Sequence, residues 1–277
     1  MKKILKCTAL VALVLGMGLT ACDSKSKSGG GKKADYPLYS SKDHANKIGA
    51  QLKVEVLGFS DKVMDVTKGE FAGNTTLKEL HFGKMVNIAE EAFKGCTSLE
   101  RIHMSQTVDV INDYAFEGCI ALKSLDGDIR TIGLGAFKGC TALDSVRTRD
   151  NIYWVREGAF EGCTNLKSVL MGMTLSKYED GAFKDCPNIE EISVPSAWRR
   201  HMFNEYKDMK NLKKVYLLVM EHYAFPADSK AFPAEQVDLY VPDNLIAQYK
   251  QDASWARFKS ILPLSQSAYY KADGWSK

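Results

Sequence analysis

Regularly spaced cysteines are the first residues in this chain whose types and positions suggest chemistry, since thiols can form disulfides or bind zinc. Five of the seven cysteines follow one another at intervals of 23, 21, 23 and 23 residues: Cys96, Cys119, Cys140, Cys163 and Cys186. Residues repeated in one register point the same way, whereas a disulfide needs two Cβ atoms that converge. The sequence has no Cys-x-x-Cys pair. We therefore predict a ladder of small buried side chains, with neither disulfides nor a zinc site.

Two histidines share a similar spacing. His81 and His103 are 22 residues apart, and Asp126 follows after another 23. On neighbouring strands, two imidazoles about 5 Å apart could bind a divalent metal or act as a pH-sensitive pair. A polar, solvated sheet surface explains the same residues without a ligand, and we prefer it. The sequence thus predicts no metal site and no cofactor, and calorimetry with zinc on wild type and His103→Ala would test the metal hypothesis.

Motifs of known catalytic sites are absent from the sequence. There is no Gly-x-Ser-x-Gly, no His-Glu-x-x-His, no phosphate loop and no dinucleotide fingerprint. Acidic residues such as Glu90 and Asp180 are explained as the solvated side of a repeat. We predict that the protein is not an enzyme and takes no small-molecule substrate.

Repeats are the elements that must position these residues. The phrase Ala-Phe-x-Gly-Cys occurs four times, and a fifth copy has Asp185 in place of glycine. The phenylalanines of these copies, with that of a weaker preceding copy, are Phe71, Phe93, Phe116, Phe137, Phe160 and Phe183. Another weak copy contains Tyr206, and an eighth begins near Ile48. A period between 20 and 30 residues indicates a solenoid.

Each repeat can be built as one coil of 21–23 residues. Apolar side chains recur five residues before and six and nine residues after each phenylalanine, as at Ile88, Leu99 and Ile102 around Phe93. The segment Leu99–Met104 ends in the alternation of a short strand, and Gly95 suits a turn with positive φ. We predict an α/β-type solenoid with one strand, one turn and a short helical or 3₁₀ stretch per coil. Stacked coils would bury the phenylalanines and the five cysteines in one core.

The solenoid is predicted to cover residues 60–236, with a cap at each end. Residues 36–59 form an N-terminal cap or degenerate coil. Residues 237–277 form the last strand, a cap helix and a tail, because Val237–Pro242 alternates like a strand and Asp243 could cap the helix that follows. These caps would shield the open edges of the stacked strands.

The motif Ile-x-x-x-Ala-Phe-x-Gly-Cys-x-x-Leu-x-x-Ile resembles the BspA-like (Treponema-type) leucine-rich repeats of bacterial surface proteins. The resemblance covers roughly residues 60–262 and departs at Asn74 and Tyr206, as terminal repeats do. It implies a right-handed leucine-rich-repeat superhelix. It also implies adhesion to host matrix or plasma proteins, or to other bacteria.

An outward-facing row of strand residues is the candidate partner-binding surface. If the residues nine and eleven after each phenylalanine point inward, those eight, ten and twelve after it point outward. We call this outer surface the ladder face. Its candidate residues are His81, His103, Asp126, Arg147, Arg149, Leu170 and Tyr216.

The N-terminus predicts export and lipid attachment. Lys2, Lys3 and Lys6 precede an apolar run that is too short to span a bilayer, and Leu19-Thr20-Ala21-Cys22 closes it. These four residues resemble a bacterial lipobox, which implies removal of residues 1–21 and lipidation of Cys22. Residues 22–35, rich in Ser, Lys and Gly, would then be a flexible tether. An ordinary secretory signal is the alternative.

Charge and composition limit the classes of partner that the protein is expected to bind. Three of the 37 Lys and Arg residues lie in the signal, so the mature chain would carry 34 basic and 34 acidic residues. No basic stripe is present, which argues against nucleic acid. We predict a lipid-anchored cell-envelope protein, at the outer membrane or cell surface rather than the inner membrane, that binds a protein or surface macromolecule. A structural envelope component that contacts neighbouring surface proteins or glycan is the alternative.

Overall fold

The computed structural model describes residues 36–39, 49–84, 87–149, 151–195, 209–225 and 232–267. The predicted signal peptide, Cys22 and the tether lie outside the described residues, as do Ile48 and Tyr206. Among the described residues, none of the helices has both the length and the apolar character needed to cross a bilayer.

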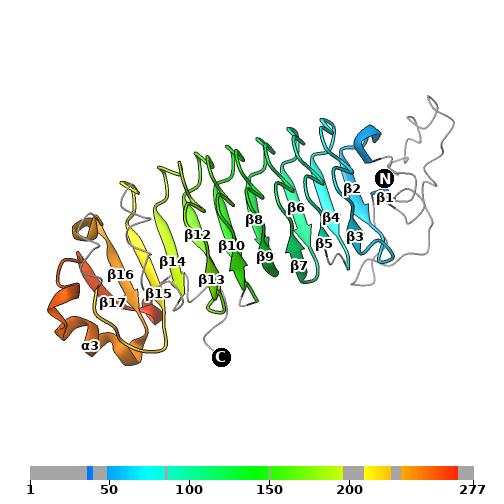
Figure 1. The fold of residues 1–277 in the computed structure, drawn as a ribbon. Helices are drawn as coiled ribbons and strands as arrows, with labels where there is room; N and C mark the ends of the chain where they lie inside the picture. Colours follow the sequence, from blue (N-terminus) through cyan, green and yellow to red (C-terminus); the bar gives the residue numbers. More distant parts are fainter. Residues whose placement is uncertain are drawn as a thin grey trace, which may run out of the picture.

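Parallel strands stacked along the long axis form the body of the molecule (Figure 1). A four-stranded sheet is followed by a seven-stranded one, and together we call them the ladder. The first sheet contains β1 (Leu38–Tyr39), β2 (Val56–Phe59), β4 (Glu79–Phe82) and β6 (Arg101–Met104). The second contains β8 (Ser124–Gly127), β10 (Ser145–Thr148), β12 (Ser168–Leu170), β14 (Glu191–Pro195), β15 (Lys214–Leu218), β16 (Asp238–Val241) and β17 (Ser260–Pro263). The predicted solenoid is confirmed.

A third parallel sheet, of six strands, runs along another side of the coils. Its strands are β3 (Asp65–Val66), β5 (Asn87–Ile88), β7 (Val108–Ile111), β9 (Ile129–Ile132), β11 (Trp154–Val155) and β13 (Lys177–Tyr178). The sequence predicted one strand per coil, and the structure adds this second one. Its inward residues, such as Ile88 and Ile111, are the aliphatic positions five residues before each phenylalanine.

The third side of each central coil is a series of turns closed by 3₁₀-type backbone bonds, such as Cys96 N to Phe93 O over 3.1 Å, rather than a regular helix. Its backbone groups bond from coil to coil: Phe93 N donates to Ala115 O over 2.7 Å, and Gly95 N donates to Glu117 O over 2.7 Å. Gly95 has the predicted positive φ, at 71°, and Asp185 adopts a φ of 58° at the equivalent position. The turn therefore also forms hydrogen bonds between coils.

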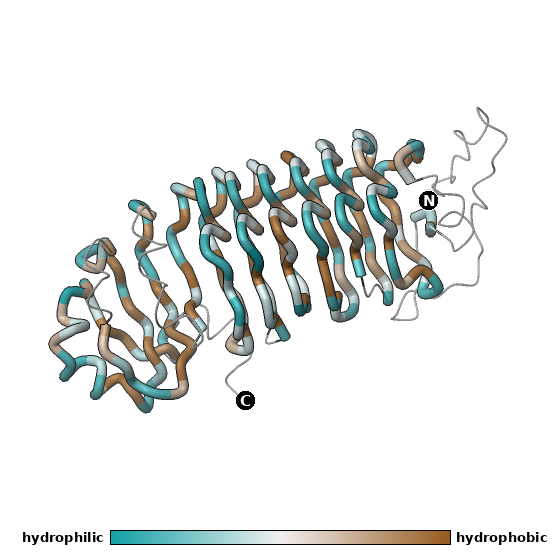
Figure 2. The backbone as a smooth tube through the Cα atoms, in the orientation of Figure 1, coloured by the Kyte–Doolittle hydropathy of each residue, from teal (hydrophilic) through white to brown (hydrophobic). Residues whose placement is uncertain are grey.

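The core is a file of stacked phenylalanine rings, as predicted. Neighbouring rings from Phe71 to Phe183 have centroids 4.9–5.4 Å apart and planes within 13° of parallel. Figure 2 shows hydrophobic and hydrophilic stretches alternating along every coil, so each coil contributes to this shared interior. Burying one aromatic side chain stabilises a fold by roughly 1.5–3 kcal/mol. Repetition over the coils holds the molecule together.

The five cysteines form a second buried file. All are free and buried, as predicted. Each thiol also donates a hydrogen bond to the carbonyl of the phenylalanine one coil earlier: Cys119 Sγ lies 3.2 Å from Phe93 O, and Cys140 Sγ lies 3.2 Å from Phe116 O. The first coil has Asn74 instead, and its Nδ2 donates to Gly49 O and Leu52 O over 3.1 and 3.0 Å. Asn74 thus ties the short helix η1 (Gly49–Gln51) to the first coil.

The C-terminal cap differs from the prediction in two details. β16 is not the last strand, because Ser260–Pro263 forms β17 and pairs with it in parallel. Asp243 does not cap the helix segments η4 (Asp243–Leu245) and α3 (Ile246–Gln251) with its side chain. Its carboxylate instead accepts hydrogen bonds from Ser265, at the start of η6 (Leu264–Gln266).

The cap contains two further short helices. The first, η3 (Ala234–Gln236), precedes β16, and the second, η5 (Ala253–Trp255), follows α3. Trp255 is fully buried, and its indole Nε1 donates to Tyr223 O over 2.7 Å. The aromatic residues of the cap therefore continue the core of the coils to the end of the solenoid.

Candidate functional site

The ladder face is accessible in its N-terminal half and closed in its C-terminal half. His103, Asp126 and Arg149 are exposed, while His81 and Arg147 are half-buried. Leu170 and Tyr216 were predicted to be exposed, and this was wrong: they retain 8% and 1% of their accessible surface. The candidate surface therefore extends only from β4 to β10.

A second hydrophobic cluster explains the closed half. Leu170, Tyr216 and Leu218 pack together, with Met173 and Leu264 against them. Tyr216 also donates from its hydroxyl to Glu191 Oε2 over 2.9 Å. Strand alternation correctly gave the side of the sheet on which these residues lie, but an apolar residue on that side can still be buried by its neighbours.

One short coil creates a break in the ladder. β6 and β8 are neighbours but are not paired as strands. β8 and β9 are separated by Asp128 alone, whereas three residues separate β6 from β7 and five separate β10 from β11. This is the coil in which Phe116 and Phe137 are 21 rather than 23 residues apart. The connection between the two strands of this coil is shorter than the connections in the coils on either side, and a hollow lies at this position.

That hollow has a volume of about 500 Å³ and is open to solvent. Its charged lining residues are Arg101, Asp126, Asp128 and Arg149, and the imidazole of His103 lies among them. Asp128 is held in place, since it accepts hydrogen bonds from Thr107 Oγ1 over 2.7 Å and from Asn151 Nδ2 over 2.9 Å. The hollow therefore presents charges of both signs, with one carboxylate already oriented.

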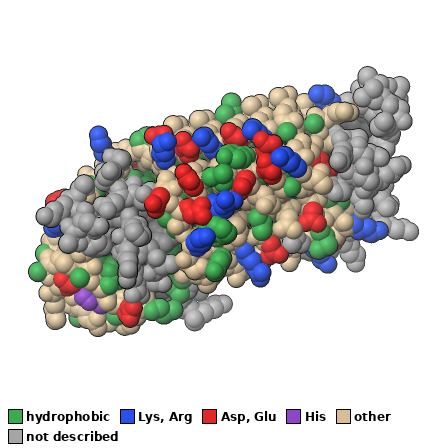
Figure 3. All heavy atoms as spheres, viewed as in Figure 1, with side chains coloured by type: hydrophobic (Ala, Val, Ile, Leu, Met, Phe, Trp, Pro, Cys, Tyr) green, Lys and Arg blue, Asp and Glu red, His purple; other side chains and the backbone are tan. Residues whose placement is uncertain are grey.

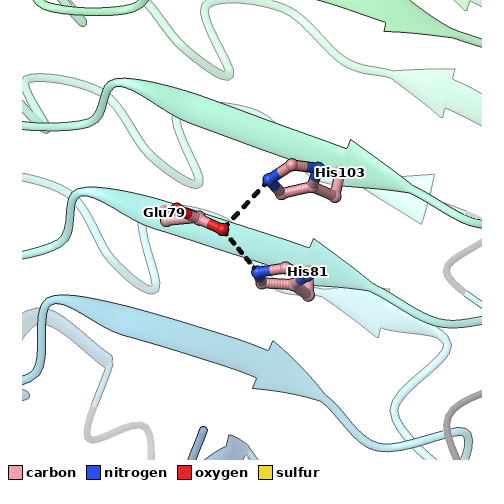
Figure 4. Close-up of side chains that lie close together, drawn as sticks. All are labelled: Glu79, His81 and His103. Atoms are coloured by element: carbon pink, nitrogen blue, oxygen red, sulfur yellow. Dashed lines mark hydrogen bonds and ion pairs between the residues drawn. The ribbon is translucent and has the colours of Figure 1, made fainter. Parts of the chain in front are cut away.

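Beside the hollow, two histidines converge on a carboxylate. His81 and His103 are paired in register on β4 and β6, and their rings stack with centroids 4.4 Å apart. Their Nε2 atoms lie 2.8 and 3.0 Å from the same oxygen, Oε1 of Glu79 (Figure 4). On the other side of His81, the ring of Tyr36 stacks at 4.1 Å. We call Glu79, His81 and His103 the histidine cluster.

The electrostatics of the histidine cluster are set by Arg101 and by burial. Arg101 Nη2 and Nε donate to Glu79 Oε2 over 2.6 and 2.9 Å, and this contact, together with the hydrogen bond from His81, lowers the pKa of Glu79. Burial lowers the pKa of His81, although its hydrogen bond to Glu79 acts in the opposite direction. The desolvation is the larger of these opposing effects. An ionised carboxylate beside a neutral imidazole is therefore the favoured state at neutral pH.

The sequence pointed to part of this cluster. It placed His81 and His103 side by side correctly, but it added Asp126 and missed Glu79. Among the described residues, the ligand atoms that lie within 4.8 Å of one another come from Glu79, His81 and His103. Glu79 is two residues before His81 on the same strand, so period-two alternation was the signal for it. Arg147 lies opposite Asp126 in the strand register. Of the two arginines Arg147 and Arg149, Arg149 lines the hollow.

Another face carries ion pairs that link successive coils. Figure 3 shows acidic and basic side chains intermingled over the central coils. The residue after each phenylalanine alternates in sign from Lys94 to Lys184. Lys94 Nζ lies 2.9 Å from Glu117, and Lys138 Nζ lies 3.0 Å from Glu161. These pairs account for the charges without a ligand.

Comparisons with known proteins agree with the repeat. Residues 50–126 and 124–226 match the BspA type leucine rich repeat region in six copies. A leucine-rich-repeat protein of T. pallidum is similar in structure, with 16% identity, 76% of this chain and 87% of that chain covered, and a TM-score of 0.43. The pneumococcal vaccine antigen PcpA gives 11% identity, coverage of 76% and 79%, and a TM-score of 0.42. A leucine-rich-repeat protein of Bacteroides ovatus gives 16% identity, coverage of 78% of this chain and 62% of that chain, and a TM-score of 0.41.

No protein with a curated description matches the chain. The six matched repeats cover well over half of the sequence and coincide with the coils of the ladder. The chain therefore belongs to the family of BspA-type leucine-rich-repeat proteins, which are typically surface or binding proteins.

Proposed function

We propose that this protein is a lipid-anchored envelope protein that binds another protein, or a surface macromolecule, through the N-terminal half of its ladder face. The observation that carries the proposal is the hollow at the ladder break. It brings Arg101, Asp126, Asp128 and Arg149 together on a surface that the second hydrophobic cluster does not close.

Mixed charge in a shaped hollow suits a partner that carries both signs. Complementary charges guide association and reject partners with the wrong pattern. Asp128 is already fixed by Thr107 and Asn151, so little conformational entropy would be lost when it pairs with a cation. A simple polyanion is a poor match, because two carboxylates line the same hollow as the arginines.

The coils supply the rigidity that such a surface needs. Arg101, Asp126 and Arg147 project from strands whose inward neighbours Ile102, Leu125 and Val146 are buried in the core. Strand neighbours lie about 4.8 Å apart. The protein would therefore present a fixed row of side chains, as solenoids do on their extended faces.

A charge-reversal experiment tests the binding surface. Asp126→Arg and Arg149→Glu, combined in one variant, reverse both signs at the hollow and keep the net charge. Photo-crosslinking on intact producing cells, followed by mass spectrometry, would record partners whose crosslinks map to β6–β10. We expect the double variant to lose these crosslinks at least tenfold.

Arg130→Glu provides the matched control, because Arg130 is exposed on β9 in the other sheet of the same coil. Its crosslinks should equal those of wild type. Equal crosslinking in all three proteins, or crosslinks that avoid the ladder face, would reject the proposed surface.

The lipid anchor is tested separately, since Cys22 lies outside the described residues. Cells fed radiolabelled palmitate should label the wild-type protein and not Cys22→Ala. Protease added to intact cells should degrade the chain if it faces outward. Label retained by Cys22→Ala, or absent from wild type, would exclude the anchor and leave the binding surface standing.

A further inference from the structure

We propose that Glu79, His81 and His103 form a binding site for a divalent transition metal, with Zn²⁺ as its representative, on the ladder face beside the hollow. This goes beyond partner binding and rests on different residues from those that test the proposed function.

Convergence of three ligand atoms is the main observation. Glu79 Oε1 and the Nε2 atoms of His81 and His103 all lie within 4.8 Å of one another. Zinc binds imidazole nitrogen at about 2.0–2.1 Å and carboxylate oxygen at about 2.0–2.2 Å, so ligand atoms of a tetrahedral site lie about 3.3 Å apart. The two N···O separations of 2.8 and 3.0 Å are already near that value. The third separation, between the two Nε2 atoms, is within 4.8 Å and would approach the same value as the metal binds.

The donor set selects the class of metal. Two imidazoles and one carboxylate suit Zn²⁺ and its neighbours in the transition series, whereas Ca²⁺ and Mg²⁺ prefer sites made of oxygen atoms. Three protein ligands leave a position for water or for a group from a partner. His103 is exposed, so that position can face solvent.

Surrounding contacts hold the ligands in place before a metal arrives. The pairing of β4 with β6 sets His81 opposite His103. Tyr36 stacks on His81, which restricts the rotation of that ring. Arg101 holds Glu79 Oε2 with two donors and thereby turns Oε1 toward the histidines. Outer contacts of this kind orient ligands in known metal sites.

Binding requires a defined rearrangement of protons. Without metal, the carboxylate accepts hydrogen bonds, so an imidazole in contact with it carries a proton on Nε2. For coordination, that proton moves to Nδ1 by exchange with water, and the Nε2 lone pair binds the metal. A protonated imidazole releases one proton to solvent instead. Glu79 stays ionised throughout, and no electron transfer occurs.

Titration calorimetry with zinc sulfate tests the site. The full chain is purified in detergent without a histidine tag and stripped with chelator. We expect one zinc per chain, and affinity lowered at least about tenfold in Glu79→Gln, His81→Gln and His103→Gln, since even outer-contact changes cost 10–100-fold. Asp144→Asn is the control, because Asp144 is an exposed carboxylate that pairs with Lys167 over 2.9 Å and belongs neither to the histidine cluster nor to the hollow, and it should bind as wild type does.

Thermal unfolding with and without zinc keeps the result clear if a variant is less stable. A metal that binds the folded state raises the unfolding midpoint. Wild type and Asp144→Asn should show that rise, and the three cluster variants should not. A flat wild-type titration without a rise overturns the proposal. Zinc binding that survives all three substitutions also overturns it, because the zinc then binds other residues. Neither result bears on crosslinking at the hollow.

Discussion

The thiol of Cys140 donates a hydrogen bond to the backbone carbonyl of Phe116, one coil earlier in the chain, over 3.2 Å. The same carbonyl accepts from Cys119 N within its own coil, over 3.1 Å. One oxygen thus receives one donor from each of two coils. The cysteine is a core residue whose weak donor still has a specific partner.

Alkaline pH should weaken the fold through these thiols. Burial raises the pKa of Cys96 and Cys140 from 9.0 to about 12. Between pH 9 and 12 the unfolded chain therefore binds fewer protons than the folded chain. The contribution of these thiols to the free energy of unfolding is fully present below pH 9 and decreases as the pH rises above it. Each such thiol contributes a decrease of about 1.4 kcal/mol per pH unit in that range.

Urea unfolding of wild type and Cys140→Ala at pH 8.0 and 10.5 measures this effect. The variant should be less stable at pH 8.0, because it loses the methyl-sized volume and the S–H···O contact. Its deficit should shrink or reverse at pH 10.5, because it has one thiol fewer to keep protonated. A deficit that is the same at both pH values would show that Cys140 ionises as easily in the folded chain as in the unfolded one.

Removing one ring from the phenylalanine file should strongly lower the free energy of unfolding. Phe137 is fully buried and stacks on Phe116 and Phe160 at 5.2 and 5.4 Å. Phe137→Ala should lower the free energy of unfolding by about 3–5 kcal/mol, as expected for a core aromatic. Tyr153→Ala, at a residue that is 58% exposed, is the control and should stay within about 0.5 kcal/mol of wild type. Chemical denaturation gives both values.

Two glycines of the same coil should respond to alanine for different reasons. Gly139 has a φ of 70° and no atom within 4 Å of an added Cβ, so Gly139→Ala should cost about 1 kcal/mol through backbone conformation alone. A Cβ on Gly133 would lie 2.6 Å from Asn112 C and 2.7 Å from Asp113 N. Gly133→Ala should therefore cost more, because backbone has to move. Equal costs in denaturant unfolding would contradict this distinction.

Reversing one charge between coils should produce an effect that depends on salt. Glu117 lies 2.9 Å from Lys94, and the hydrogen bonds that Lys94 donates to the carboxylates of Glu117 and Glu91 raise the pKa of that lysine. Glu117→Lys replaces attraction by repulsion, so the midpoint of thermal unfolding should fall slightly. The decrease should nearly vanish in 1 M NaCl, where the screening length is about 3 Å. Glu117→Gln, which only removes the charge, should fall between wild type and Glu117→Lys.

The coils were predictable because their signal is repeated. Phe93 and Cys96 each have equivalents in every central coil, so one register determined which residues stack. Four of the six strands in the sheet that contains Ile88 and Ile111 have only two residues, which is too little alternation to be recognised alone, and the sheet was missed. Asp243 was predicted as a helix cap from its position, but Ser265, 22 residues later, competes for the same carboxylate.

The candidate site was only partly predictable. A local sequence pattern shows to which side of a sheet a side chain points, but it does not show whether distant residues bury that side chain. Alternation placed His81 and Leu170 on the same outer face, but nothing near Leu170 in the sequence marks the later segments that contribute Tyr216 and Leu264 to its cluster. Glu79 was within reach of the same rule, two residues from His81. The hollow also had a signal, since the interval of 21 residues between Phe116 and Phe137 marks the short coil.

The bonds between coils also determine how such a protein can change in length. Phe116 O is joined to Cys140, and Phe137 O to Cys163, by the same contact at the same distance. Deleting or duplicating one whole period in the central coils would therefore join two surfaces that already match. The ends have no such freedom, since Asn74 and Trp255 make contacts that occur once. The central coils are therefore interchangeable, whereas the two ends are not. The number of coils, and with it the length of the ladder, can vary while the terminal contacts stay the same.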